Sequence, residues 1–577
     1  MTDRCYIGLA STMHDPAIAI VDSSGEPVFA EAAERYLQVK RAYNCPPDEM
    51  LRTPRLVEEY CGDSEIVAAL SWSSGFGADL NRLLATHDLP SPTDFTTDEF
   101  SWPLPNPKAL LRAMGNSVNQ AALNLISSEL IPNRITLRRS DHHSTHAAMA
   151  AYTSPFAECV VAIIDGYGEA SSVGVFHYHD GVLEPIRVAR AASESPVASL
   201  GYLYSKLCAF CGFDPIAGEE WKVMGLAAYG SFDQSLYDLL SPLVEVDGIG
   251  LRSGCSADEV TRRLARLRRQ VRPTSSSPRE AADLAHTGQR LFEERALELV
   301  QNVYGLELSD NVAIGGGCAL NSSFNGRIVQ NTGFTALHVP SAPADDGNAL
   351  GAALLAYHQD HPGVGPPCRT QHPYLGSRLD PAGIARLDRH GRVGRRSDLR
   401  QVGVGKVADL LAEGKIVGWV QGRAEFGPRA LGNRSILANP TIPDIKDRLN
   451  GEVKFREEFR PFAPSILDEA GSDYFIAYQT SPYMERALRF RPGAARRVPG
   501  VVHTDGTGRL QSVRPEWNPR FHDLLSAFED RTGVPVVLNT SFNLMGKPII
   551  HSVEDALGVF LTSGLDVLVL DDLIIEK

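Results

Sequence analysis

Two histidines one helical turn apart are the first residues whose spacing indicates chemistry. His142 and His146 lie in the stretch SDHHSTHAAMAAY, which has helical character. Residues four positions apart project from the same face of a helix, and two imidazoles placed in this way can bind one metal ion. Paired histidines on an alanine-rich helix can also be ordinary packing residues, so the metal hypothesis needs further ligands.

Carboxylates from two loops could complete such a site. Asp165 follows the apolar run CVVAII, and Asp345 precedes the helical stretch GNALGAALLAYHQ. Two imidazoles with two carboxylates suit Fe, Zn or Mn, and iron is a natural choice for mixed nitrogen and oxygen ligands. We therefore predict a divalent metal site, with Fe(II) as the favoured ion. His143 and Asp346 are adjacent alternatives that the spacing leaves open.

Glycine-bounded segments indicate where a nucleotide or phosphate could bind. GGGCALN lies between a predicted strand and a predicted helix, where backbone N–H groups can meet a phosphate. Such a loop is often only a tight turn. The segment GEEWKVMGLAAYG adds charged residues, although it also fits a plain loop-to-helix transition. The candidates for nucleotide or substrate binding here are Gly316, Gly317, Asn321, Glu219 and Lys222.

His14 is a candidate general base. It follows the first predicted strand and stands beside Asp15 and Pro16. An imidazole with a pKa near its ordinary value of about 6.5 can remove a proton from an alcohol near neutral pH. The alternative is that His14 only caps the turn that precedes Asp15.

The densest run of cations lies in the C-terminal part of the chain. GRAEFGPRALGNRSILANP and LNGEVKFREEFRPFAPSI interleave basic residues with Gly, Pro, Ser and aromatic residues, without the period of an amphipathic helix. Arginine side chains bind phosphate through two parallel hydrogen bonds. We therefore predict a pocket for a phosphorylated substrate, in which KFR is joined by SFN from a distant strand end. The residues concerned are Arg423, Arg429, Arg434, Lys454, Arg456, Arg460, Ser541 and Asn543.

Composition narrows the class of protein. A chain of 577 residues with 43% hydrophobic and 22% charged residues is expected to form at least two domains. Its net charge of −14 argues against general attraction to nucleic acid or anionic lipid. The first residues lack the pattern of a signal peptide, and the sequence contains no apolar run of the length that predicts a membrane span. Nine scattered cysteines, including the CxxC of Cys208 and Cys211, predict free structural thiols in a reducing cytoplasm.

The order of the predicted elements indicates an α/β protein. Apolar runs over 5–10, 17–21 and 28–34 predict a strand meander, and CVVAII and NVAIG predict further strands that end in polar loops. Long amphipathic stretches, such as 279–305, predict helices between them. No internal repeat is evident. A stretch over 362–381 is dense in Pro and Gly and predicts a domain boundary, which we place between residues 365 and 366.

These motifs together resemble one family. The segments DHHSTHAAMAAYTSPF, DGYGE, GEEWKVMGLAAYG, GGGCALN, DDGNALGAA, GRAEFGPRALGNRSIL, VKFREEFRPFAP, SPYM and LNTSFN are similar, in this order, to those of the O-carbamoyltransferases of nodulation-factor, cephamycin and aminoglycoside biosynthesis. The likeness is greatest to tobramycin-type enzymes. It implies an N-terminal domain of the actin and sugar-kinase kind over 1–365 and a YrdC-like α/β domain over 366–577.

The resemblance also implies an activity. Carbamoyl phosphate and ATP would form carbamoyl adenylate in the C-terminal domain, where Lys454, Arg456, Ser541 and Asn543 match the KxR and SxN signature. The N-terminal domain, with its metal, would pass the carbamoyl group to a hydroxyl of a small molecule. Alternatives are a kinase of the sugar-kinase fold and a nucleotide-dependent assembly module. The sequence identifies neither the acceptor nor the oligomeric state, for which a homodimer is one option.

Overall fold

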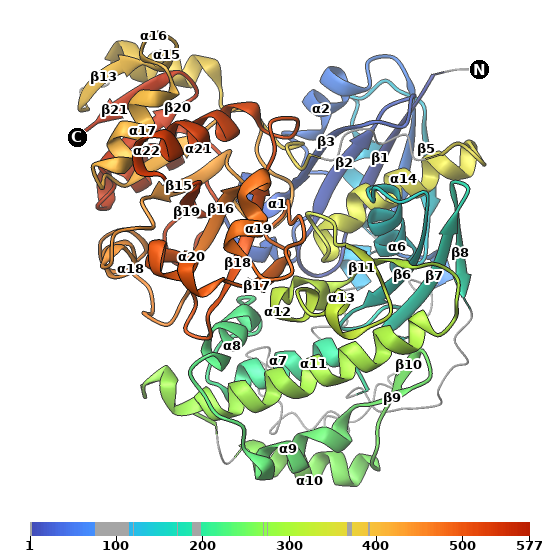
Figure 1. The fold of residues 1–577 in the computed structure, drawn as a ribbon. Coiled ribbons are helices and arrows are strands. Elements are labelled where there is room, and N and C mark those ends of the chain that lie inside the picture. The colour runs from blue at the N-terminus through green and yellow to red at the C-terminus, as the bar shows by residue number, and fades with distance from the viewer. Residues whose placement is uncertain are drawn as a thin grey trace. The chain divides into compact units, whose positions relative to one another are not determined.

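The computed structural model describes residues 3–75, 115–118, 120–169, 171–186, 198–268, 271–273, 275–365, 372–390 and 393–577. The chain divides into two compact units, each of which mixes helices and strands (Figure 1). The N-terminal unit comprises Met1–Ala33 and Arg41–Gln371, and the C-terminal unit comprises Glu34–Lys40 and His372–Lys577. The α/β class predicted from the sequence is confirmed. Part of the predicted boundary segment, over 366–371, lies outside the described residues.

The first sheet of the N-terminal unit has the order β3-β2-β1-β4-β5. The predicted meander supplies three antiparallel strands, because β1 pairs with β2 and β2 with β3. The other two strands join in parallel, β4 to β1 and β5 to β4. Their bounds are Arg4–Ala10 for β1, Ala17–Val21 for β2, Pro27–Ala32 for β3, Glu65–Leu70 for β4 and Ile135–Arg139 for β5.

The second sheet of this unit repeats the same scheme. Its order is β8-β7-β6-β11-β12, again an antiparallel meander extended by two parallel strands. These strands are β6 (Glu158–Ile164), β7 (Val173–His179), β8 (Val182–Ile186), β11 (Asn311–Gly315) and β12 (Ala336–His338). The unit is therefore duplicated in topology, although its two halves show no repeat in sequence.

Two helices are exchanged between the halves. Helix α6 (His142–Tyr152) follows the first sheet but packs on β6, β7 and β11, whereas α14 (Asn348–Asp360) follows the second sheet and packs on β1, β2 and β4 (Figure 1). The two helices also pack on each other. Glycines permit the close approach of α14 to both β1 and α6. A Cβ on Gly8 of β1 would lie 1.7 Å from the Ala349 carbonyl oxygen of α14, and one on Gly351 of α14 would lie 1.9 Å from the Thr145 carbonyl oxygen of α6. The exchange brings the loops of both halves to one place.

A helical subdomain lies between β8 and β11 in the sequence. It contains α7 (Leu200–Phe210), α8 (Glu220–Ala227), α9 (Gln234–Leu240), α10 (Ala257–Arg268) and α11 (Ala282–Tyr304), so that the long helix predicted over 279–305 is present. The eight described cysteines are free, and Cys208 and Cys211 are buried there. Among the described helices, none combines the length and apolarity needed to cross a bilayer.

The C-terminal unit is built on one mixed sheet of order β13-β21-β20-β14-β15-β19-β16-β18-β17. Its central strands are almost wholly buried, and α17 (Val404–Ala412) packs on α21 (Pro519–Thr532). Further helices that contribute to this core include α15 (Pro381–His390), α20 (Pro492–Arg497) and α22 (Val553–Thr562). The strands are Arg395–Asp398 for β13, Val417–Val420 for β14, Arg434–Ala438 for β15, Ala463–Leu467 for β16, Arg486–Arg489 for β17, Thr507–Val513 for β18, Val536–Ser541 for β19, Val567–Leu570 for β20 and Leu573–Glu576 for β21.

Candidate functional site

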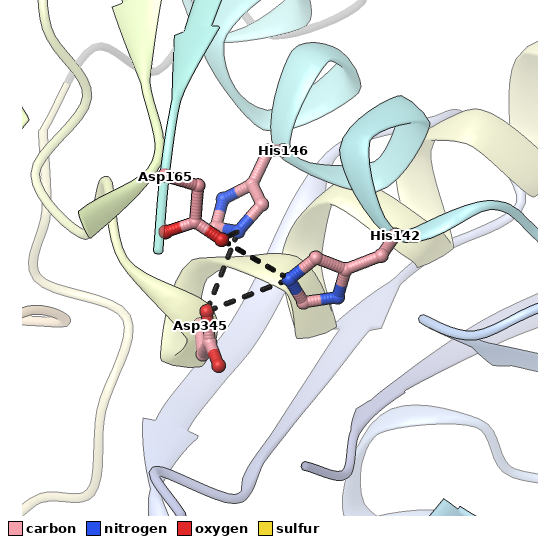
Figure 2. A group of neighbouring side chains, drawn as sticks. All are labelled: His142, His146, Asp165 and Asp345. Atoms are coloured by element: carbon pink, nitrogen blue, oxygen red, sulfur yellow. Dashed lines mark ion pairs between the residues drawn. The ribbon is translucent and has the colours of Figure 1, made fainter. Parts of the chain in front are cut away.

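The exchanged helices and the strand ends converge on a cluster of four side chains (Figure 2). One nitrogen or oxygen atom from each side chain lies within 4.8 Å of those of the others. His142 Nε2 lies 3.6 Å from an oxygen of Asp165 and 3.6 Å from an oxygen of Asp345. His146 Nε2 lies 3.8 Å and 3.4 Å from the same two carboxylates. The structure thus brings together the four residues proposed as metal ligands, namely His142, His146, Asp165 and Asp345.

Neighbouring groups hold these ligands in orientation. Asp141 caps α6 by accepting a hydrogen bond from the Ser144 backbone N–H. The indole of Trp72 stacks on the His142 ring, with centroids 4.1 Å apart. The side-chain amide nitrogen of Asn348 lies 3.5 Å from His142 Nδ1, which leaves Nε2 directed at the carboxylates. Supporting groups of this kind orient metal ligands in proteins.

Asp165 is held by the glycine-rich loop. The backbone N–H of Gly317 donates to Asp165 Oδ1 at 2.9 Å, while Oδ2 faces the two histidines. The loop itself is fixed because the Gly316 N–H donates to the Pro343 carbonyl, two residues before Asp345. The glycines proposed for nucleotide binding therefore lie beside the proposed metal ligands, and Gly317 orients one of these, Asp165.

The protonation of the cluster reflects two opposing effects. Burial disfavours the charged form of His142, but the carboxylates of Asp165 and Asp345 outweigh it and raise the pKa of His142 to about 10. Burial likewise opposes ionisation of Asp165, yet hydrogen bonding to His142 lowers the pKa of that carboxyl to about 2. Hydrogen bonds to His142 and His146 outweigh burial and hold the pKa of Asp345 well below its ordinary value. The cluster thus holds two ionised carboxylates whose charge is compensated by a protonated histidine or by a bound metal cation.

The donor set fits a divalent metal. All four side chains are largely buried, and His146 Nε2 has no hydrogen-bond partner among the residues that the structure describes. Two imidazole nitrogens and two carboxylate oxygens match the ligands that Fe, Zn and Mn accept. The alternatives point elsewhere: His143 packs against Gly168 and Gly174, and Asp346 accepts from the Gly347 N–H. Burial lowers the pKa of His143 to about 4.

His14 lies at the edge of this cluster. Its Nδ1 is 2.9 Å from an oxygen of Asp15 and 3.7 Å from an oxygen of Asp345. Arg41 also contacts Asp15, at 3.0 Å, and the Tyr43 ring packs on the imidazole with centroids 5.9 Å apart. The imidazole is thus adjacent to a proposed metal ligand and is partly accessible, as a group that receives a proton from a substrate must be.

The other polar candidates of this unit have internal partners. Asn321 caps α12 (Ser322–Asn325) by accepting from the Phe324 N–H, and its amide forms a reciprocal pair with Gln289. Lys222 is buried and lies 2.6 Å from Glu219. Their proposed roles in nucleotide binding stay predictions. A ligand that bound to Asn321 or Lys222 would have to replace these internal contacts.

In the C-terminal unit, the two halves of the KFR and SFN pattern meet. Lys454 ends a π-helical turn over Leu449–Lys454, and Ser541 ends β19. The Lys454 ammonium is buried and donates to the Ser541 carbonyl at 2.7 Å and to the Asn543 side-chain oxygen at 2.5 Å. The Ser541 hydroxyl donates to the same Asn543 oxygen at 2.8 Å. None of these acceptors is a carboxylate.

Arginines gather around this lysine. Burial, with the nearby charges of Arg456 and Arg460, holds the pKa of Lys454 well below its ordinary value. Burial and the charge of Arg460 also hold the pKa of Arg456 well below its ordinary value. The Arg456 guanidinium lies 4.4 Å from the centre of the Phe462 ring. Arg460 itself pairs with Glu457. Like charges held close together out of water favour a bound anion.

Two further arginines extend the basic group. Burial lowers the pKa of Arg429 to about 10. Burial, with the charges of Arg429 and Arg456, holds the pKa of Arg509 well below its ordinary value, and Arg509 Nε has no hydrogen-bond partner in the described part of the chain. Arg509 lies on β18, about 50 residues from the KFR motif in sequence, so no local spacing could have marked it.

Two of the predicted phosphate-binding arginines are engaged with the protein backbone. Arg434 is fully buried and donates to the carbonyl oxygens of Gln421, Asn433, Ser377 and Gly422. Arg423 donates to those of Gly376 and Leu375. A role in binding phosphate stays a prediction for both, and the contacts seen here hold the loop.

Glu425 organises the loop that carries Arg429, and the sequence analysis missed it. One oxygen of this buried carboxylate accepts from the backbone N–H groups of Leu431, Asn433 and Arg434, at 2.6, 2.8 and 3.0 Å. The only signal in the sequence is an acidic residue within a run of glycines and arginines. Such a residue reads as a salt-bridge partner rather than as an anchor for backbone.

Comparison with known proteins places this arrangement in a family. Residues 118–354 match the model described as carbamoyltransferase N-terminus, and residues 408–577 match carbamoyltransferase C-terminus. The nodulation protein NolNO of Sinorhizobium fredii is 32% identical over 98% of this chain and 79% of its own length. The 3'-hydroxymethylcephem-O-carbamoyltransferase of Amycolatopsis lactamdurans is 30% identical over 77% of this chain and 82% of its own.

The chain therefore belongs to the carbamoyltransferase family and is an enzyme of that class. Among solved structures, full-length HypF in its phosphate- and nucleotide-bound form is similar over 62% of this chain and 55% of its own, at 12% identity and a TM-score of 0.32. A likeness at that score supports no argument about fold or activity.

Proposed function

We propose that this enzyme activates carbamoyl phosphate with ATP and transfers the carbamoyl group to a hydroxyl of a small natural product. In the first step water releases phosphate from carbamoyl phosphate, and an oxygen of the resulting carbamate attacks the α-phosphorus of ATP as pyrophosphate leaves. In the second step the acceptor oxygen attacks the carbamoyl carbon, AMP leaves, and the acceptor loses its hydroxyl proton. One ATP and one water are consumed for each carbamoyl group.

The observation that supports this proposal most directly is the meeting of the buried Lys454 ammonium with uncharged oxygens of the half-buried Ser541 and Asn543. Arg429, Arg456 and Arg509 extend its positive charge. Phosphates of ATP and of carbamoyl phosphate are the ligands that relieve this repulsion through charge-assisted hydrogen bonds. We assign activation to this site and propose that the C-terminal unit is YrdC-like.

The metal centre of the N-terminal unit is the proposed site of transfer. A divalent metal, with Fe(II) as first choice, would polarise a carbonyl or phosphate oxygen there when held by His142, His146, Asp165 and Asp345. Trp72 and Asn348 keep His142 in place. The His14 imidazole, 3.7 Å from Asp345, is positioned to take the hydroxyl proton of the acceptor.

The duplicated topology of the N-terminal unit supports assigning it to the actin and sugar-kinase kind of fold. In both halves an antiparallel meander is extended by two parallel strands, and the candidate residues stand where strands of both halves end. Antibiotics and other hydroxylated natural products, aminoglycosides first, are the acceptors we propose. We place the reaction in the cytoplasm.

The test is a product analysis. The enzyme is incubated with ATP, carbamoyl phosphate, Fe(II) and a panel of hydroxylated antibiotics, and products are identified by mass spectrometry, with carbamoyl phosphate omitted as control. A carbamoylated acceptor, with AMP and pyrophosphate, is expected. A phosphorylated acceptor with ADP would instead make the protein a kinase. Nucleotide turnover that ignores carbamoyl phosphate would indicate an assembly module.

A further inference from the structure

A short N-terminal segment belongs to the C-terminal unit. Residues Glu34–Lys40 follow β3 in the chain but pack with residues His372–Lys577, and the N-terminal unit resumes at Arg41. The segment includes most of α1 (Ala33–Leu37). More than 330 residues of sequence separate it from the unit that it joins, so no sequence motif marked it.

This segment contacts the blocks of sequence that form the proposed activation site. Arg35 donates to the Gly427 carbonyl at 2.6 Å, two residues before Arg429. Gln38 donates to the Ile549 carbonyl at 3.0 Å, in the loop that follows the SFN motif. The positive charge of Lys40 contributes to the lowered pKa of Lys454. One segment therefore borders the EFGPR loop, the SFN loop and the KFR turn.

Arg35 stands out within the segment. Its side chain is 3% exposed, and its Nη2 donates to one neutral carbonyl. Its Nη1 is buried and has no hydrogen-bond partner within the described ranges of the chain. Among the residues that the structure describes, no carboxylate pairs with it. A buried guanidinium is costly unless an anion compensates it, and arginine offers donors in a geometry that suits phosphate.

We propose that Arg35 is an anion-binding residue of the activation site, with Nη1 donating to a phosphoryl oxygen of a substrate. This inference rests on the proposed function. The ligand is a phosphate group of ATP or of carbamoyl phosphate, which share this chemistry. The segment Glu34–Lys40 is accordingly a working part of the C-terminal site, in addition to the residues that the KxR and SxN signature supplies.

The test measures binding in the full chain. ATP and carbamoyl phosphate are titrated separately by calorimetry into the parent, Arg35→Met and Arg35→Lys. Loss of a charge-assisted contact is expected to weaken one of the two ligands by about 10- to 100-fold in Arg35→Met. Arg35→Lys, which keeps the charge but loses the fork, should fall between Arg35→Met and the parent. The ligand that is weakened identifies the phosphate that Arg35 binds.

A matched control separates binding from folding. Arg272 in the N-terminal unit is also buried and donates to backbone carbonyls, so Arg272→Met should cost stability without weakening either ligand. Affinities for both ligands within twofold of the parent in Arg35→Met and Arg35→Lys would overturn the inference. Release of pyrophosphate by the parent is measured in parallel. Its absence, with binding still dependent on Arg35, would refute the proposed function alone.

Discussion

The two candidate sites of this protein gather side chains of opposite charge. In the proposed metal centre of the N-terminal unit, two ionised carboxylates face two histidines, and these carboxylates raise the pKa of His142 to about 10. In the basic site of the C-terminal unit, the buried Lys454 donates to uncharged oxygens, and its pKa lies well below the ordinary value. A histidine pKa that carboxylates raise indicates a site that attracts a cation. A lysine pKa that burial and nearby arginines lower indicates a site that attracts an anion.

Under the proposed function, each half-reaction takes place at the site whose charge suits it. ATP and carbamoyl phosphate are anions that the basic site would compensate, and transfer would take place beside the proposed metal centre. If this division holds, variants in one unit should abolish one step and leave the other intact. The following predictions test that separation.

The largest effect is expected for the lysine of the basic site. Lys454→Ala should reduce release of pyrophosphate from ATP and carbamoyl phosphate to background, because removing a preorganised cation from a water-excluded site typically costs about 100- to 1000-fold or more. Ser541→Ala should act in the same direction, since it removes the hydroxyl that donates to the Asn543 side-chain oxygen, which also accepts from Lys454. Metal content should be unchanged in both. Lys446, which donates to the Val502 carbonyl in the same unit, provides the control Lys446→Ala. Pyrophosphate release at the parent rate in Lys454→Ala would refute the assignment.

Loss of the metal should affect only the second step. His146→Ala and His142→Ala each remove one of four ligands, and elemental analysis should find the metal lost along with carbamoyl transfer. Pyrophosphate release in the C-terminal unit should continue, so carbamoyl adenylate should form without being passed on. His143→Ala, one position along the same helix, is the matched control and should keep its metal. Stoichiometric metal in the His146 variant would exclude the proposed site.

A smaller effect is expected for the candidate base. His14→Asn should retain metal and nucleotide and slow transfer by about 100- to 10,000-fold, the usual contribution of general-base catalysis. If His14 only caps a turn, the same change should cost about 1 kcal/mol of stability and little activity. Rates of transfer from pre-formed carbamoyl adenylate, measured together with thermal unfolding, distinguish the two roles. Turnover near that of the parent would show that His14 is structural.

The smallest effect concerns a buried lysine that belongs to neither site. Burial lowers the pKa of Lys206 in α7 to about 7 from the ordinary lysine value of 10.5. Below pH 7 the side chain is charged in the folded and unfolded states, so the folded protein bears the full cost of burial. Between about pH 7 and 10.5 the folded state releases the proton and the unfolded state keeps it, so stability rises with pH.

Lys206→Met should therefore stabilise the protein by about 1 kcal/mol or more at pH 6, and the gain should shrink towards pH 10. Denaturant unfolding of the parent and the variant at both pH values measures this difference. Activity should be unchanged in this variant, unlike in Lys454→Ala, although both lysines have lowered pKa values. An equal gain at both pH values would show that Lys206 does not titrate in this range.

Much of the local structure and the residues of both candidate sites could be named from the sequence. The meander, the long helix over 279–305 and the helical spacing of His142 and His146 depend on periodicity and on neighbouring residues, which a sequence displays directly. The KFR and SFN motifs lie far apart in the sequence, and the resemblance to the family is what identifies them as one signature. Local patterns indicate which side chains share a face, and a family resemblance indicates which motifs act together.

Other features were decided only by the tertiary structure. The topology is duplicated without a sequence repeat, because strand order depends on pairings between distant residues that many different apolar sequences satisfy. The exchange of α6 and α14, which brings Asp165 and Asp345 to the histidines, is such a long-range packing choice. Long-range packing also places Arg509 beside Arg429 and Arg35 beside Gly427. A sequence determines these contacts only through the energy of the whole fold, and no short stretch of it carries their signature.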